Sequence, residues 1–155
     1  MIPVDEFWQY SINTYRKKDV KRACLILQDE LNANVNVLLF CMYLADKKTA
    51  ISAEALQYLQ HLIQASDDQI KAHREKRKAL KTMGGDLYKK ALDEELKMER
   101  AIQDILLEAF SSAELPMRNT DSFSQAIKGY LLSFDKTLVF ESTHIHAINT
   151  LAANI

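Results

Sequence analysis

Few residues in this chain have the types and the spacing that support metal binding or catalysis. Glu141 and His144 lie three residues apart, which places two ligands on one face of a helix in di-iron proteins. A complete di-iron site needs a second such pair, and neither His61 nor His73 follows an acidic residue at that spacing. His144 and His146 could share a metal if this segment were a strand. We expect no metal site and interpret both residues as part of a partly exposed terminal segment.

The sequence also lacks the usual motifs for nucleotide binding and for cysteine catalysis. No glycine-rich loop precedes a Lys-Ser or Lys-Thr pair, and we expect Gly84-Gly85 to lie between helices rather than after a strand. Cys24 and Cys41 have Ala, Leu, Phe and Met as neighbours, whereas a nucleophilic cysteine needs an exposed, electropositive setting. We expect two reduced core cysteines without a disulfide between them. No catalytic residue and no cofactor is therefore assigned.

Three amide side chains near the most apolar segment are candidate ligand-binding residues: Gln28, Asn34 and Asn36. Amides without partners would be costly there, by about 1–3 kcal/mol each. They could line a pocket, which would make the protein an enzyme or a small-ligand binder. The alternative, which we favour, is that Asn34 or Asn36 caps the helix that begins beside them.

The charge pattern of residues 71–108 is the most informative irregularity. One predicted helix holds the candidate nucleic-acid-binding residues Lys71, Arg74, Arg77, Lys78 and Lys81. A helix rich in basic residues could contact phosphates. The next predicted helix is rich in acidic residues, and folding the chain back at Gly84-Gly85 would bring Arg74 level with Glu95 and Lys78 level with Ala91. We favour this antiparallel hairpin, in which the acidic helix neutralises the basic one.

Composition and periodicity indicate an all-α fold. The 155 residues include only 3 Gly and 2 Pro, and none of them lies between Val4 and Met83. We predict a single helical domain over 1–155, a bundle of about six helices with the polar hairpin around Gly84-Gly85. The segment from Val35 to Ala45 is apolar nearly all round and should be central. Ser52 should cap the next helix, and Ser66-Asp67-Asp68 could restart one.

Two segments remain open in this interpretation. Pro116 and the polar residues up to Thr120 should break the chain between helices. Residues 136–155 are rich in β-branched side chains, and helix, strand or an exchanged arm are all possible there.

The net charge of -1 creates no overall attraction to nucleic acid or to membranes. The longest apolar run, Val37 to Ala45, is about half of what a membrane span needs. The first ten residues carry acidic side chains and no basic start, so they do not form a signal peptide. We expect a cytoplasmic protein that does not bind membranes.

Several short motifs resemble a small family of proteobacterial proteins of unknown function. They are Phe7-Trp8-x-Tyr10-Ser11, Tyr15, Ala23-Cys24-Leu25-x-Leu27-Gln28-Asp29 and Asn34-Val35-Asn36-Val37-Leu38-Leu39-Phe40-Cys41. The resemblance extends through the basic and acidic helices and fades after Leu115. Family members often carry Pro-Gly at Lys18-Asp19 and Trp at Tyr43. The resemblance implies a bacterial cytosolic setting and brings no known activity, cofactor or catalytic residue.

Three functions follow from these observations. The first is a protein-interaction or regulatory module with an unknown protein partner, because catalytic motifs are lacking and helix surface is ample. The second is an RNA- or ribosome-associated protein that uses the Lys71–Lys81 helix. The third is an enzyme or small-ligand binder with a pocket near Asn34 and Asn36. A homodimer is compatible with each of them.

Overall fold

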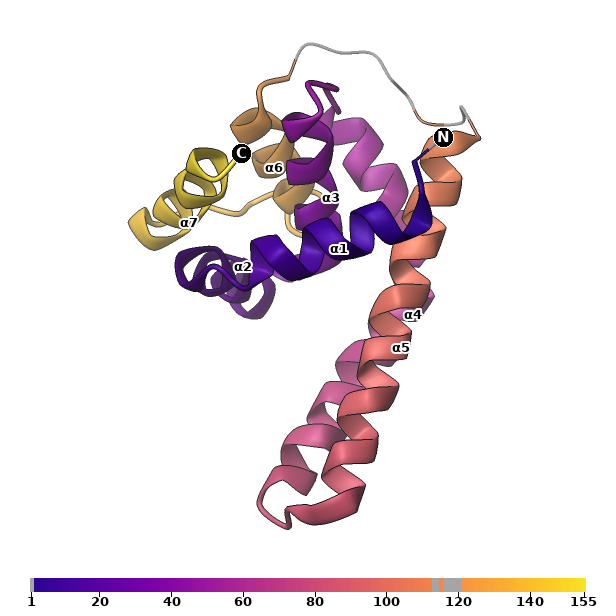
Figure 1. The fold of residues 1–155 in the computed structure, drawn as a ribbon. Helices are drawn as coiled ribbons and strands as arrows, with labels where there is room; N and C mark the ends of the chain where they lie inside the picture. Colours follow the sequence, from indigo (N-terminus) through magenta and orange to yellow (C-terminus); the bar gives the residue numbers. More distant parts are fainter. Residues whose placement is uncertain (1, 113–114, 116–120) are drawn as a thin grey trace.

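A computed structural model describes residues 2–112, 115 and 121–155, and the described chain is all-α (Figure 1). The break expected at Pro116 to Thr120 lies outside the described residues, apart from its flanks. In the described residues there are seven helices rather than about six: α1 (Val4–Tyr15), α2 (Lys18–Leu31), α3 (Val35–Asp46), α4 (Ala53–Lys81), α5 (Gly85–Ser111), α6 (Phe123–Leu132) and α7 (Ser142–Ala153).

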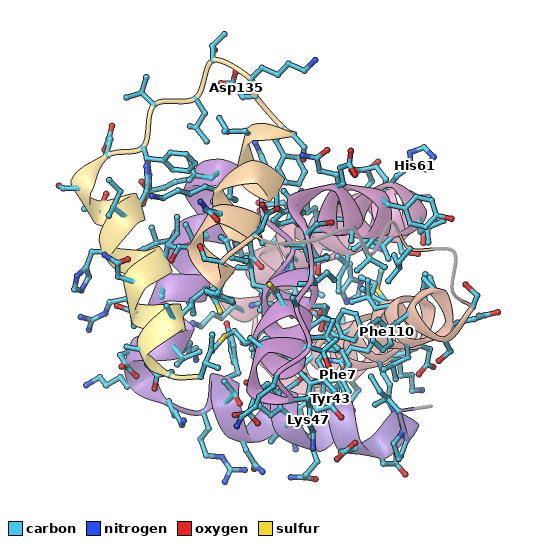
Figure 2. All side chains as sticks on the ribbon, turned by 90° about the horizontal axis from the view of Figure 1, so that it is seen from above. Phe7, Tyr43, Lys47, His61, Phe110 and Asp135 are labelled. Carbon is cyan, nitrogen blue, oxygen red and sulfur yellow. The ribbon has the colours of Figure 1, made fainter. Side chains whose placement is uncertain are left out.

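Helix α3 is the centre of the fold, as its apolar sequence predicts. Every residue from Val35 to Leu44 is buried, and α3 contacts α1, α2, α4, α5 and α6. Aromatic rings pack α1 against α3, since Phe7 lies edge-on to Phe40 at 5.1 Å between ring centroids. Figure 2 looks down on this region, with Phe7, Tyr43 and Lys47 labelled close together.

Helices α4 and α5 form a long antiparallel hairpin that projects away from the other helices (Figure 1). Gly84 and Gly85 make the turn with φ of 62° and 76°, a left-handed backbone that glycine adopts without steric cost. Ser52 caps α4, since its side chain accepts a hydrogen bond from the Ala55 N–H at 3.1 Å. The predicted turn and cap are both confirmed.

The expected restart of a helix at Ser66 to Asp68 is wrong, because α4 continues through these residues without interruption. Asp67 is completely buried and accepts hydrogen bonds from Asn34 at 2.8 Å and from Gln60 at 2.9 Å. Lys71, one turn later on α4, forms an ion pair with it at 3.2 Å. Asn34 from outside the helix, together with Gln60 and Lys71 of α4 itself, satisfies a carboxylate that would otherwise favour a helix end.

The C-terminal segment forms a helix, α7, which packs against α2. Glu141 and His144 build a capping box at its start, in which the Glu141 N–H donates to His144 Nδ1 at 3.1 Å. The other ring nitrogen of His144 lies 3.0 Å from Glu30 of α2. The β-branched residues of this segment made helix, strand or an exchanged arm possible from the sequence. The cap and the contact with α2 stabilise the helix.

Within the described part of the chain, none of the helices combines the length and the apolar character that crossing a bilayer requires.

Candidate functional site

A pocket of about 750 Å³ lies at the base of the hairpin. Five helices, α1 to α5, contribute to it, and its volume lies within the range typical of small-molecule sites. Its walls are largely apolar and are formed by Trp8, Ile12, Tyr15, Leu25, Val35, Leu39 and Leu96. The pocket therefore has the volume and the apolar walls of a site that encloses an organic molecule.

Buried amides line the pocket, where α1, α3 and α5 meet. The Gln103 side chain is 3% exposed, and its Nε2 donates to Ser11 Oγ at 2.9 Å and to Asn36 Oδ1 at 3.0 Å. Its Oε1 atom is buried and has no hydrogen-bond partner among the described residues. A buried acceptor without a donor costs about 1–3 kcal/mol, so Gln103 is an energetically unusual residue of the pocket lining.

Two ion pairs between the hairpin helices form a charged wall of the pocket. Arg74 of α4 donates to Glu99 Oε1 of α5 at 2.7 Å, and Arg77 donates to Glu95 Oε1 at 2.7 Å. The other oxygen of Glu99 accepts a hydrogen bond from the Asn36 amide, which joins this wall to the amides. The hydrogen bond to Glu95 raises the pKa of Arg77.

The ion pair of Arg74 is offset by about one helical turn from the predicted arrangement, because Arg74 pairs with Glu99 rather than with Glu95, the residue expected level with it. In an antiparallel pair, the side chains of each helix lean toward that helix's own N-terminus. Arg74 on α4 therefore leans away from the hairpin tip, while Glu99 on α5 leans toward it. The two meet although their backbones lie at different heights.

The three predicted ligand-binding amides have different positions. Asn36 and Gln28 both line the pocket, and Gln28 donates to the neighbouring Asp29 at 3.2 Å. Asn34 does not line it and instead caps α3, accepting from the Asn36 N–H at 2.8 Å. Its backbone N–H donates to the buried Tyr130 hydroxyl at 3.0 Å. Capping, the favoured interpretation, thus applies to Asn34, whereas the side chain of Asn36 belongs to the pocket.

The five predicted nucleic-acid-binding residues do not form one uniform basic surface. Arg74, Arg77 and Lys78 line the pocket, where both arginines are paired with carboxylates. Lys71 is paired with Asp67 inside the fold, and Lys78 is paired with the exposed Glu75 at 3.4 Å. Lys81 is exposed at the end of α4, near the tip of the hairpin.

Sequence reasoning did not assign most of the pocket lining to a site, including Trp8, Ser11, Glu99 and Gln103. Gln103 carried a detectable signal, because it lies within the stripe of α5 that buries Ile102 and Leu106. A polar side chain in such a stripe requires polar partners elsewhere in the fold. Ser11 and Glu99 carried a similar signal, because helical spacing places Ser11 between Phe7 and Tyr15 and Glu99 between Leu96 and Ile102.

Other titratable groups in the described residues offer no competing site. No group of three or more His, Cys, Asp or Glu side chains is placed to hold a metal ion in the described part of the chain. Cys24 and Cys41 are free and buried, and burial raises the pKa of the Cys24 thiol to about 12. A thiol in this state is a poor nucleophile at neutral pH.

A profile of the family described as "Protein of unknown function (DUF2390)" matches residues 6–106, and the chain therefore belongs to this family. No curated protein and no solved structure matches the chain. The matched segment runs from α1 into α5 and contains every residue that lines the pocket, from Trp8 to Gln103. The pocket is thus built entirely by the segment that defines the family.

Proposed function

We propose that this member of the DUF2390 family binds a small organic molecule in the pocket at the base of the hairpin. The observation that carries the proposal is the largely apolar pocket of about 750 Å³, whose lining also includes the amide side chains of Asn36 and Gln103. A concave site that combines apolar walls with a few polar groups is typical of small-molecule binding. A ligand with an apolar body and a hydrogen-bonding group would suit this lining.

The lining residues indicate the chemistry of this molecule. Trp8 and Tyr15 offer aromatic surface, while Asn36 and Gln103 offer hydrogen bonds. The ionised side chains of the lining balance, since Arg74, Arg77 and Lys78 stand against Asp29, Glu95 and Glu99. This pocket favours a neutral or zwitterionic molecule with an apolar body and a polar end over a highly charged one.

We favour small-molecule binding over the protein-interaction role that was favoured from the sequence. The reason is that the pocket is concave and has polar groups that converge on it. The RNA-associated alternative draws less support from the geometry. Arg74 and Arg77 would have to leave Glu99 and Glu95 before they could contact phosphate, which would leave two partly buried carboxylates unpaired.

The proposal can be tested with the full chain purified from its own cells. Native mass spectrometry should detect a small molecule that leaves the protein on denaturation. Trp8, the single tryptophan of the sequence, lines the pocket, so its fluorescence should change when metabolites from a neutral and zwitterionic library bind.

The variant Ile12→Trp fills the pocket from its wall and should abolish both binding and ligand-induced thermal stabilisation. The matched control Asn13→Trp places the same side chain on the exposed neighbour outside the pocket and should keep both. Absence of a bound molecule together with no response in the library would overturn the proposal. Tight, salt-sensitive RNA binding that Lys81→Glu weakens would support the RNA-associated alternative instead.

A further inference from the structure

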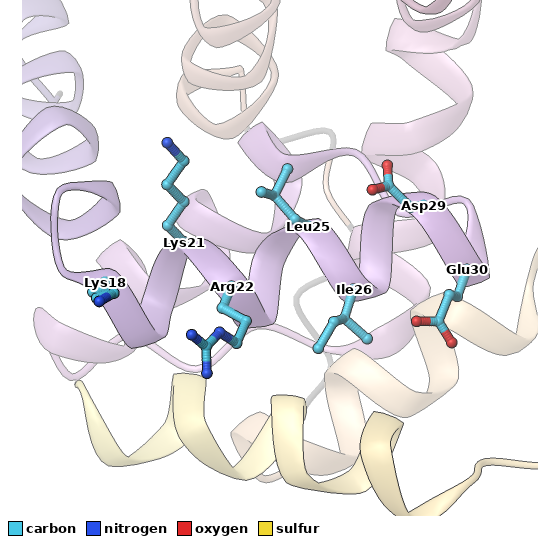
Figure 3. Close-up of a pocket in the computed structure, with 7 residues that line it drawn as sticks. All are labelled: Lys18, Lys21, Arg22, Leu25, Ile26, Asp29 and Glu30. Atoms are coloured by element: carbon cyan, nitrogen blue, oxygen red, sulfur yellow. The ribbon is translucent and has the colours of Figure 1, made fainter.

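The exposed face of α2 carries charges in an unusual order (Figure 3). Two rows of side chains run along it, Lys21-Leu25-Asp29 and Arg22-Ile26-Glu30, with Lys18 preceding the second row. Each row begins with a basic residue, has an aliphatic residue in the middle and ends with an acidic residue. These residues line a shallow groove of about 320 Å³ on the outside of the helix.

This order opposes the dipole of the helix, which favours acidic side chains near the N-terminus and basic ones near the C-terminus. Asp19 is the only acidic residue of the first turn, and the last turn has no basic residue. Ion pairs within the described part of the chain do not compensate for the arrangement. Lys18, Lys21, Arg22 and Asp29 form no ion pair there, although the Lys21 ammonium lies 5.9 Å from the centroid of the Tyr15 ring and Glu30 contacts His144.

We propose that the α2 face binds a second copy of this chain, with the two α2 helices antiparallel and a twofold axis passing beside Leu25 and Ile26. Each row then meets the same row of the other copy in reverse. Lys21 faces the partner's Asp29, and Arg22 faces the partner's Glu30. The aliphatic residues pack together in the middle, as the self-complementary surface of a twofold dimer requires.

Charge complementarity favours a second copy of this chain as the partner and favours the antiparallel orientation of the two α2 helices. A parallel arrangement would place basic ends against each other and acidic ends against each other, which is repulsive. The 14 residues of α2 span about 21 Å, so the patch is smaller than a standard interface of roughly 800 Å² per partner. The dimer is therefore weak and depends on ionic strength.

The α2 face also adjoins the pocket, because Leu25 and Asp29 line both the shallow groove and the larger cavity. A second copy on α2 covers one edge of the pocket mouth. The dimer itself depends only on the side chains of the α2 face, so its test is independent of the proposed ligand.

The test is sedimentation equilibrium of the full chain at protein concentrations up to about 1 mM, in low and high salt. A monomer–dimer equilibrium is expected at about 0.01 M salt, and it should shift toward monomer at about 1 M. Lys21→Glu and Asp29→Lys should each weaken the dimer by at least about tenfold, because both place like charges opposite each other. The control Lys90→Glu changes the net charge equally on α5, away from α2, and should leave the dimer unchanged.

Mixing the two weakened variants gives the decisive result. In a heterodimer of Lys21→Glu with Asp29→Lys, both facing pairs again have opposite charges, so association should return although neither variant associates alone. A loss of folding cannot produce this recovery. A wild-type chain that stays monomeric at about 1 mM in low salt would overturn the proposal, as would mixed variants that remain monomeric.

Discussion

The side chains of Asn36 and Gln103, 67 residues apart in the sequence, share a hydrogen bond of 3.0 Å beside the pocket. This bond ties the first turn of the central helix α3 to the middle of the hairpin helix α5. Asn36 also donates to Glu99, so a single amide joins the neutral and the charged parts of the lining. The position of the hairpin relative to the other helices thus depends on polar contacts as well as on apolar packing.

Replacing Gln103 by leucine tests the value of this bond. Gln103→Leu leaves Asn36 Oδ1 and Ser11 Oγ without their shared donor, while it also removes the unpaired Oε1. Two lost hydrogen bonds against one relieved acceptor give an expected net loss of about 1–3 kcal/mol in the free energy of unfolding. The control Gln57→Leu removes an exposed hydrogen bond to Gly129 and should cost less than about 1 kcal/mol. Urea denaturation measures both, and equal losses would show that the Gln103 bonds have no special weight.

The pairing of Arg74 with Glu99 can be measured by a double-mutant cycle. Arg74→Glu places like charges together in a partly buried site and should cost more than about 1 kcal/mol, and adding Glu99→Arg should recover part of the loss. The same exchange at Lys78 and Glu75, both well exposed, should change stability by less than about 1 kcal/mol. A coupling energy near zero for Arg74 and Glu99 would contradict the register of the hairpin described above.

Acid stability should report the contact between Glu6 and Tyr43. The hydrogen bond from the Tyr43 hydroxyl, at 2.6 Å, is the main cause that lowers the pKa of Glu6 below 4.5, and Lys47 adds to it. A lowered pKa in the folded state contributes stability that is present above the unfolded pKa and is lost as pH falls through the folded one. Tyr43→Phe should therefore be less stable than the wild type at neutral pH, and the difference should shrink in acid. Urea denaturation over a pH series measures this, and a difference that grows toward acid pH would contradict it.

Helices α4 and α6 approach closely where Gly129 faces Ala53. A Cβ atom at position 129 would overlap the Ala53 side chain, so Gly129→Ala should destabilise the fold by about 1–3 kcal/mol. Without this contact, the same change inside a helix would stabilise by about 0.4–1 kcal/mol, so the sign of the effect decides. The second change Ala53→Gly should recover part of the loss in thermal denaturation. Stabilisation by Gly129→Ala alone would refute the close approach.

The two thiols should react only after unfolding. Cys24 and Cys41 are buried, and burial raises the pKa of both thiols. A thiol reagent at mildly alkaline pH should modify the native protein slowly and should count two free thiols in denaturant without reductant. A count of zero would mean that a disulfide exists, and rapid modification of the native protein would mean that these positions are accessible.

The sequence determined those features that arise within a single helix or at its ends. The apolar residues on every face of α3 required a central position, because exposing any of these faces to water would destabilise the fold. Ser52 and Gly84-Gly85 are local signals, and the cap and the turn they predicted are present. Membership of a family of unknown function was also predicted from the sequence, and the family match over residues 6–106 confirms it.

Only the tertiary structure decided what depends on contacts between helices. Asp67 is a residue type typical of helix ends, yet a hydrogen bond from Asn34 stabilises it inside α4, and the contact between His144 and Glu30 joins α7 to α2. Arg74 meets Glu99 rather than a residue level with it, because side chains lean along their helices. The pocket is the clearest case, because Ser11, Asn36 and Gln103 come from three helices that the sequence does not place beside one another. Periodicity fixes which face of a helix is buried, but the packing of all the helices together fixes which residues meet there.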